Sequence, residues 1–200
     1  MQCRLMSLYQ QSTTKSLYDL RPTFFVRNFS IRAAGVLFYR RSPRDASQCG
    51  GNEGNIEFLF MRRHPLSSNL SSNLSSNLNH GDWLYEDFGG KTDSVDATVI
   101  DTAAREVDEE SNHAFASDWL REQLLLAKWR GNFCINGRCK YIVFIVPAPE
   151  DLDITTFGNV ENGTSYQREV VWVSQEQVKD LPLHPRLRTP YLLGSLRKAS

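Results

Sequence analysis

The segment at residues 87–112 constrains the fold most strongly, because it joins two different backbone patterns within a short distance. Its first part continues a strand-like run, 83–88, into the pair Gly89-Gly90, which predicts a turn. Its second part has apolar residues at helical spacing, preceded by Asp96 as a candidate N-cap. We therefore expect a strand, a glycine turn and a helix over residues 98–111. The apolar stripe of that helix consists of Ile100, Ala103, Ala104 and Val107.

Short apolar and β-branched runs elsewhere in the chain predict further strands. These runs lie at residues 30–41, 56–63, 132–135, 138–146 and 168–174. Two more helices are predicted at residues 118–129 and 175–181, and the first of them has Leu120, Leu124 and Leu125 on one side. Because strands and helices alternate along the chain, we expect an α/β fold with a mixed β-sheet between helices.

The composition fits one folded domain, because 200 residues with 40% hydrophobic content can bury a full core. Lys and Arg total 23, as do Asp and Glu, so no overall field attracts nucleic acid. The chain has no apolar run of the roughly 18 residues that a membrane span requires, and its N-terminus lacks the apolar core of a secretory signal. We expect a cytoplasmic protein with no membrane partner.

The ends of the chain differ in composition from its centre. Residues 1–29 form an N-terminal extension in which Asp19 is the one acidic residue, so it is either poorly ordered or a targeting segment. A mitochondrial location is therefore the alternative. The domain is expected at residues 30–185, with a low-complexity loop at 65–80 that repeats Ser-Ser-Asn-Leu, and a tail follows at 186–200.

Cys134 and Cys139 flank Asn136-Gly137, the preferred pair for a two-residue hairpin turn. If this turn forms, the two cysteines face each other with Cα atoms about 4.5 Å apart, within reach of a disulfide. We expect both thiols to be reduced in a cytosol, and a disulfide formed after oxidation is the alternative.

The predicted helix at residues 98–111 gathers negative charge, because Glu106, Glu109 and Glu110 project to one side of it. Like charges one turn apart repel by about 0.2–0.5 kcal/mol per pair. Arg105 can pair with Asp101 and Glu109, but it cannot neutralise the whole group. Carboxylate oxygens on a rigid element suit Mg²⁺ or Mn²⁺. The alternative is a solvated acidic helix face that binds nothing.

The residues directly before this helix suit a phosphate-containing ligand. Gly89 and Gly90 let the backbone approach a metal ion or a phosphate without a Cβ in the way. Lys91 adds a cation at the same place. A diphosphate could bind there, with metal ions that polarise phosphoryl oxygens and activate a water.

The same residues match a known signature, so the segment resembles the Nudix box of the Nudix hydrolase family. Three features depart from that box: Asp96 replaces a Glu, the spacing from it to Arg105 is one residue longer, and Asn112 replaces a Gly. We expect the first two to weaken the Asp96–Arg105 pair, whereas Asn tolerates the left-handed backbone that glycine serves. The matching residues are Gly90, Arg105, Glu106, Val107, Glu109 and Glu110.

The resemblance spans residues 30–181 and implies an α/β/α sandwich. It implies a hydrolase that cleaves a pyrophosphate bond in a nucleoside diphosphate linked to another moiety, with Mg²⁺ or Mn²⁺ as cofactor. Arg105 would orient the carboxylates, and Glu161 or Glu169 would serve as base or extra ligand, although Glu169 also suits a plain surface strand. The alternative is a catalytically silent Nudix-like module that binds a nucleotide or a protein. The implied metal ligands are the Gly90 carbonyl, Glu106, Glu109 and Glu110. Glu106 and Glu109 are also implied as catalytic residues, together with Arg105 and with Glu161 or Glu169.

Lys91, Arg63 and Tyr85 are the candidate substrate-binding residues. Arg63 ends a predicted strand, where it either binds outer phosphates or caps a surface edge. Tyr85 either stacks on a base or packs in the core, as alternating strand aromatics do. The expected partner is a small nucleotide. A capped RNA is less favoured, because the balanced charge does not indicate a basic groove.

Overall fold

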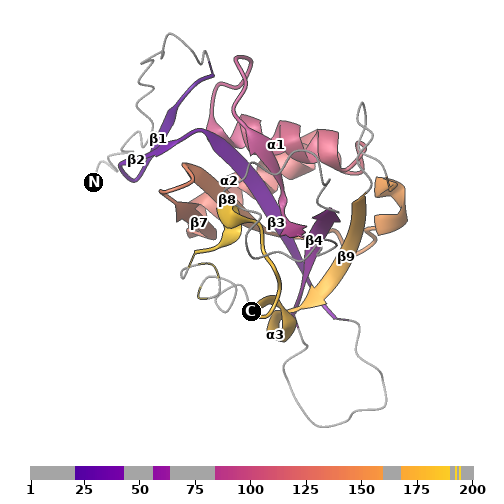
Figure 1. Cartoon of the computed structure of the whole chain (residues 1–200). Helices are drawn as coiled ribbons and strands as arrows, with labels where there is room; N and C mark the ends of the chain where they lie inside the picture. The colour runs from indigo at the N-terminus through magenta and orange to yellow at the C-terminus, as the bar shows by residue number, and fades with distance from the viewer. Residues whose placement is uncertain are drawn as a thin grey trace, which may run out of the picture.

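Seven strands of the described residues form a mixed β-sheet that carries helices on its faces (Figure 1). The computed structural model describes residues 21–42, 56–63, 84–159 and 168–189, together with 192 and 194. The sheet strands are β3 (Ala33–Arg41), β4 (Ile56–Arg63), β5 (Leu84–Glu86), β6 (Phe88–Lys91), β7 (Phe133–Asn136), β8 (Tyr141–Pro147) and β9 (Arg168–Ser174). The remaining elements are the hairpin β1 (Phe24–Val26) and β2 (Phe29–Ile31), the helices α1 (Val99–Glu110), α2 (Ser117–Arg130) and α3 (Gln175–Val178), and the 3₁₀ turns η1 (Ile154–Phe157) and η2 (Pro185–Leu187).

Strand β3 lies at the centre of the sheet and has neighbours of both orientations. Its residues 33–39 pair in parallel with the whole length of β8. On its other side its first half pairs antiparallel with β6 and its second half pairs antiparallel with β4. Strand β4 continues the sheet to β5 and β9, and β7 closes the opposite edge against β8. The predicted α/β class with a mixed sheet is confirmed.

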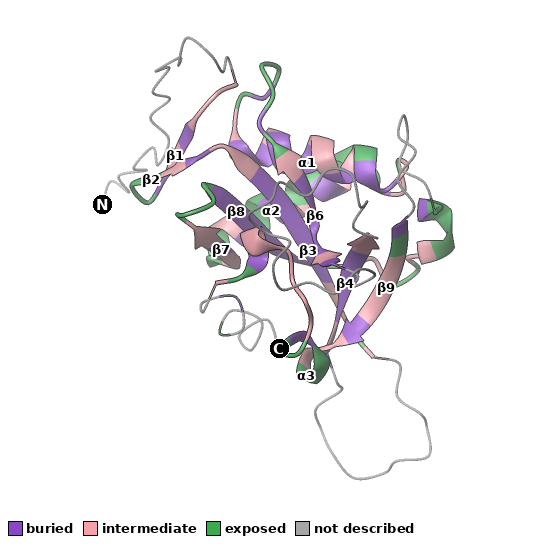
Figure 2. Cartoon of the chain, viewed as in Figure 1, coloured by how far each residue is buried: buried purple, intermediate pink, exposed green. Residues whose placement is uncertain are grey.

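The two faces of the sheet bury separate sets of side chains, because successive strand residues point to opposite faces. On β4, Leu59 and Met61 belong to the core beneath α1 and α2. Phe58 and Phe60 belong to the core on the other face, which Val178 of α3 and residues near the C-terminus cover. Figure 2 shows β3 and β8 buried along most of their length, whereas exposed residues lie on the helices and at loop ends. The sheet is thus covered on both faces.

The predicted glycine turn is wrong, because Gly89 and Gly90 lie inside strand β6. They pair with Gly35 and Ala34 of β3. The physical reason is space: a Cβ on Gly89 would lie 2.4 Å from the Cα of Gly35. The predicted strand is interrupted at Asp87, which separates β5 from β6.

Both central helices form close to their predicted bounds, but two details differ. Helix α1 has Thr98 as its N-cap, whose side chain accepts from the backbone N–H of Asp101, so the prediction of Asp96 as the cap is wrong. Leu124 of α2 is fully buried, whereas Leu125 is 48% exposed. The predicted grouping of Leu125 with the core leucines is therefore also wrong, since consecutive helix residues lie about 100° apart around the axis. The third predicted helix is the single turn α3.

The hairpin of β7 and β8 does not place its cysteines opposite each other. Asn136 pairs with Tyr141 at the end of the ladder, so the loop runs over residues 137–140 and the predicted two-residue turn is wrong. Cys134 lies opposite Val143 and is buried, and Cys139 lies exposed in the loop as a second free thiol. The Asn136 amide donates to the carbonyls of Pro185 and Arg186, while its Oδ1 accepts from the Cys139 N–H within the longer turn.

The N-terminal hairpin packs on the domain, because Phe24 and Ile31 are buried in the core beneath α1 and α2. Arg32 interrupts the strand predicted at residues 30–41 and separates β2 from β3. The low-complexity segment at 65–80 and residues 1–20 lie outside the described residues. In the described part of the chain, no helix is long and apolar enough to cross a membrane.

Neighbouring leucines of α2 offer a matched test of this packing. We expect Leu124→Ala to lower the free energy of unfolding by about 2–5 kcal/mol, because it leaves a cavity in the core. Leu125→Ala changes the same residue type at an exposed position and should alter stability by less than about 0.5 kcal/mol. Urea unfolding of both variants measures the difference. Equal losses would mean that α2 packs in another rotation about its axis.

Candidate functional site

Two largely buried carboxylates of α1 lie against the glycines of β6. Glu106 and Glu110 are one helical turn apart and therefore share a face. An oxygen of Glu110 accepts a hydrogen bond from the backbone N–H of Gly89 at 2.5 Å. A Cβ on Gly90 would lie 2.3 Å from Oε2 of Glu106, so a side chain there would displace that carboxylate from its present position. The sequence pattern of two glycines and a Glu-rich helix thus becomes one contact surface.

Arg63 supplies the counter-charge for the more buried of the two carboxylates. It lies at the end of β4, and its Nη2 is 2.6 Å from Oε1 of Glu110. The Glu110 side chain is 5% exposed and that of Arg63 is 26% exposed. Both oxygens of Glu110 therefore have donors, one from the backbone and one from a strand that is distant in sequence.

Arg105 organises the acidic groups on the outer side of α1. Its guanidinium lies 2.9 Å from Oε1 of Glu106 and 3.2 Å from Oε2 of Glu109, and it donates to the carbonyl of Lys91 at 2.8 Å. Burial opposes its charge, but the hydrogen bond to Asp96 and the charge of Glu106 outweigh burial, so the pKa of Arg105 is raised. The predicted Arg105–Asp101 pair is wrong.

Asp96 pairs with Arg105 despite the longer spacing, so the expected weakening of this pair is not what the structure shows. Its Oδ1 lies 3.2 Å from Nε of Arg105, and its Oδ2 accepts from the Thr102 hydroxyl at 2.8 Å and from the Asp93 N–H at 2.7 Å. The extra residue is accommodated in the irregular segment before α1, which begins only after Thr98. Asp101 pairs instead with Arg121 of α2.

The three glutamates of α1 differ in their surroundings. Glu109 is 53% exposed, whereas Glu106 and Glu110 are largely buried. Burial raises the pKa of Glu106, while the charge of Arg105 acts in the opposite direction. Among the described residues, no three His, Cys, Asp or Glu side chains are arranged to hold a metal ion. Two carboxylates beside a bare backbone still suit Mg²⁺, which typically takes one or two carboxylates and completes its shell with water and phosphate oxygens.

The other predicted site residues lie in several places. Lys91 is exposed at the end of β6, beside Arg105. Tyr85 is half-buried and packs edge-on against Phe60, on the sheet face away from α1. Glu169 forms an ion pair with Arg62, its partner across β4 and β9, and side-chain alternation places both on that same face. The structure thus does not bring Glu169 to Glu106 and Glu110. Glu161 lies outside the described residues.

A buried polar cluster that the sequence did not indicate lies beneath the β6 glycines. Asp87 is fully buried and accepts from the Tyr141 hydroxyl at 2.6 Å and from Nε of Arg186 at 2.9 Å. Burial raises the pKa of Tyr141 well above its usual value, so the phenol stays protonated and donates. Arg186 also pairs with Glu86 at 3.2 Å. Asp87 lies two residues before Gly89, but Tyr141 and Arg186 come from distant segments, so local pattern gave no signal for the cluster.

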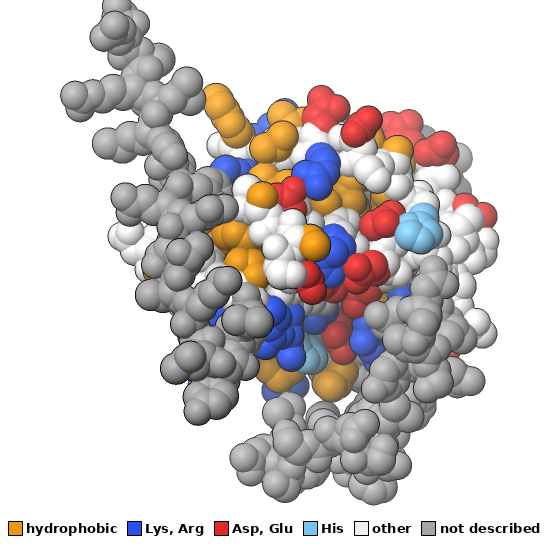
Figure 3. All heavy atoms as spheres, turned by 90° about the horizontal axis from the view of Figure 1, so that it is seen from above, with side chains coloured by type: hydrophobic (Ala, Val, Ile, Leu, Met, Phe, Trp, Pro, Cys, Tyr) orange, Lys and Arg blue, Asp and Glu red, His pale blue; other side chains and the backbone are white. Residues whose placement is uncertain are grey.

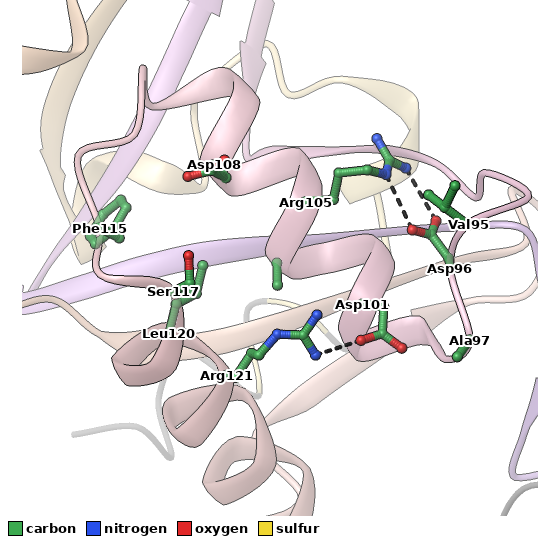
Figure 4. A pocket seen from close by; sticks show the side chains of 11 residues that line it. Val95, Asp96, Ala97, Asp101, Arg105, Asp108, Phe115, Ser117, Leu120 and Arg121 are labelled. Atoms are coloured by element: carbon green, nitrogen blue, oxygen red, sulfur yellow. Dashed lines mark hydrogen bonds and ion pairs between the residues drawn. The ribbon is translucent and has the colours of Figure 1, made fainter.

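A cavity of about 400 Å³ lies on the outer side of Arg105, between the starts of α1 and α2 (Figure 4). Its floor is apolar, with Ala104 and Leu120, and ion pairs of Arg105 with Asp96 and of Arg121 with Asp101 cross its rim. Arg105 is therefore shared between this cavity and the buried carboxylates. The space-filling view in Figure 3 shows basic and acidic side chains interleaved on one face of the molecule.

Comparisons with known proteins give structural similarities alone. No protein-family model matches the sequence, and no curated protein matches it. The chain is similar to a Nudix hydrolase from M. smegmatis, RenU, at 22% identity over 84% of each chain with a TM-score of 0.41. It is similar to a C. elegans Ap4A hydrolase at 16% identity over 84% of this chain and 94% of that one, with a TM-score of 0.39. The E. coli ORF135 protein is similar at 18% identity over 84% and 89%, with a TM-score of 0.41. Similarities at this level do not assign a function.

The imidazole of His184 is expected to make stability depend on pH. Burial lowers the pKa of His184 below that of a free imidazole, about 6.5. Between these values the unfolded chain binds a proton that the folded chain does not, so the free energy of unfolding falls as the pH drops below about 6.5. His184→Asn keeps an acceptor for the Arg186 N–H and should reduce this fall, measured by urea unfolding from about pH 8 to about pH 5.

His113→Asn is the matched control, because the His113 side chain is 66% exposed and pairs only across the surface with Asp108. This variant should keep the pH profile of the wild type. If His184→Asn also keeps that profile, another group causes the acid sensitivity.

Proposed function

We propose that this chain is a Nudix-type, metal-dependent hydrolase that cleaves a pyrophosphate bond in a nucleoside diphosphate linked to another moiety. The observation that carries the proposal is the contact of Glu106 and Glu110 with the Gly90 and Gly89 backbone. Buried carboxylates repel unless each has a cationic partner. Two carboxylates beside a backbone without side chains supply oxygen ligands and leave space for a metal ion and a diphosphate.

Glu106 and Glu110 would hold Mg²⁺ or Mn²⁺, and the backbone at Gly90 would complete the protein's part of the coordination. The bound ion would polarise phosphoryl oxygens and lower the pKa of a water. Glu109, which is more exposed, would join through a side-chain rotation or accept a proton from the attacking water. Arg105 keeps Glu106 and Glu109 oriented.

Two cations would bind the phosphates of the substrate. Lys91 is exposed directly after the β6 glycines, and Arg63 forms an ion pair with Glu110. A metal ion at Glu110 would compete with Arg63 for the same oxygen and release its guanidinium for a phosphate, which Arg binds in a forked geometry. A small nucleotide fits better than RNA, because basic and acidic side chains alternate on the face in Figure 3.

Substitution of Glu106 should lower the hydrolase activity, whereas substitution of an exposed glutamate elsewhere should not. The assay measures phosphate released by a coupled phosphatase from a panel of nucleoside diphosphate derivatives, in Mg²⁺ or Mn²⁺. We expect metal-dependent turnover in the wild type and a loss of at least about 100-fold in Glu106→Gln and in Glu109→Gln. Glu122→Gln, which changes an exposed glutamate of α2, should keep full activity.

If the folded wild type releases no phosphate from any compound of the panel, the proposed hydrolase activity is contradicted. In that case Glu110 and Glu106 would remain paired with Arg63 and Arg105 and would not bind a metal ion. Nucleotide binding by calorimetry without turnover would support the catalytically silent module in its place.

Arg63 and Arg62 are neighbours on β4 that point to opposite faces, which makes them a matched pair. Arg63→Gln should raise KM for the nucleotide by about tenfold, because a hydrogen bond between charged groups is lost. It should not weaken Mn²⁺ binding, since Glu110 loses a competitor. Arg62→Gln removes the Glu169 pair and should leave both constants unchanged. Weaker Mn²⁺ binding in Arg63→Gln would show that Arg63 supports the metal site instead of competing for it.

A further inference from the structure

We infer that Asp87, Tyr141 and Arg186 form a positioning cluster for the carboxylates of α1. The cluster touches none of the groups that the proposed function assigns to the substrate. It lies on the opposite side of β6 from Glu106 and Glu110. Its effect on them would pass through the backbone of Phe88, Gly89 and Gly90 and through the charge of Arg186, which acts on both Glu106 and Glu110. The inference rests on the proposed function, which assigns these carboxylates to a metal ion.

The Tyr141 hydroxyl reaches Asp87 through a gap that two glycines leave open. Gly35 and Gly89 are partners in the pairing of β3 with β6. A Cβ at Gly35 would lie 2.0 Å from the Tyr141 hydroxyl oxygen, and a Cβ at Gly89 would lie 2.3 Å from it. The missing side chain of Gly89 therefore leaves space for Tyr141 on one face of the sheet, and that of Gly90 leaves space for Glu106 on the other.

Arg186 holds the other side of Asp87. Its Nε donates to Oδ1 of Asp87 at 2.9 Å, and its Nη2 donates to the Asp87 carbonyl at 2.8 Å. These bonds fix both the side chain and the peptide that leads into β6. Arg186 comes from η2, and its side chain is 14% exposed. Arg186, which is distant in sequence, thus holds the residue that directly precedes β6.

The fixed strand start determines where the donor for Glu110 lies. Asp87 is two residues before Gly89, whose N–H donates to Glu110 at 2.5 Å, and Gly90 follows against Glu106. A shift of Asp87 would move this donor and the surface that both carboxylates contact. Loss of a donor to a buried carboxylate is costly. Metal affinity and the rate of the chemical step should therefore respond to the cluster, whereas substrate affinity should not.

Tyr141→Phe removes the hydroxyl alone and retains the ring. In the full chain we expect the Kd for Mn²⁺, measured by electron paramagnetic resonance, to rise by about tenfold, because a buried acceptor loses its donor. The kcat should fall by about tenfold with little change in KM. Tyr39→Phe removes a hydroxyl from a half-buried tyrosine of β3 outside the cluster and should leave all three constants unchanged.

Arg186→Lys and Arg186→Met separate positioning from simple packing. The lysine keeps a charge that can reach Asp87, so it should recover part of the Mn²⁺ affinity that the methionine loses. Thermal unfolding of each variant establishes that it is folded at the assay temperature. If Arg186→Met is unfolded, Tyr141→Phe and Arg186→Lys still carry the test.

Three outcomes decide between the alternatives. If Tyr141→Phe lowers the melting temperature but changes neither Mn²⁺ affinity nor kcat, the cluster is structural only and the inference is overturned. If KM rises while Mn²⁺ affinity stays constant, the cluster binds substrate, and the inference is overturned as well. If the wild type binds Mn²⁺ without turnover and Tyr141→Phe weakens that binding, the positioning role stands and the proposed hydrolase fails.

Discussion

The close approach of β3 and β6 at Gly35 and Gly89 is the constraint on which the candidate site depends. With no Cβ on either strand at this point, polar groups reach the same stretch of backbone from both faces of the sheet. Glu106 and Glu110 approach from the α1 face, and the Tyr141 hydroxyl approaches from the other. A side chain at Gly89 would displace Tyr141, and one at Gly90 would displace Glu106. The glycines therefore couple the two faces, a role that the sequence, which predicted a turn and a close backbone approach, did not indicate.

Charge compensation explains how so many ionised groups are buried in one small region. The acidic groups are paired by arginines from three separate parts of the fold: Arg63 of β4 for Glu110, Arg105 of α1 for Asp96 and Glu106, and Arg186 of η2 for Asp87. A buried charge without a partner would cost several kcal/mol, so each arginine contributes chiefly by preventing that penalty. Such pairs also tie the elements into one register. A divalent ion would enter this arrangement by exchanging partners, not by filling an uncompensated site.

Local features of the fold were predictable because they depend on residues close in sequence. The periodicity of strands β3, β4 and β9 and of helices α1 and α2 is contained within each segment, and Asn112 adopts the left-handed backbone that its position suggested, at φ 54°. Tertiary contacts overrode the remaining local signals. Asn136 donates to the carbonyls of Pro185 and Arg186 and precedes a four-residue turn in place of the predicted two-residue one, and Arg105 pairs with Asp96 and not with Asp101. No periodicity could indicate that Tyr141 and Arg186 meet at Asp87.

The Asp96–Arg105 pair shows why spacing is a weaker criterion than contact for a motif of this kind. The extra residue before α1 would break the pair if the segment were rigid, but it is accommodated in an irregular connection whose shape the sequence pattern does not encode. The shorter Asp then reaches Arg105 while also accepting from Thr102 and Asp93. What must be retained is the set of acceptors that orient Arg105, and with it Glu106 and Glu109. A sequence can therefore depart from the spacing of a signature while keeping the interactions that gave the signature its chemical meaning.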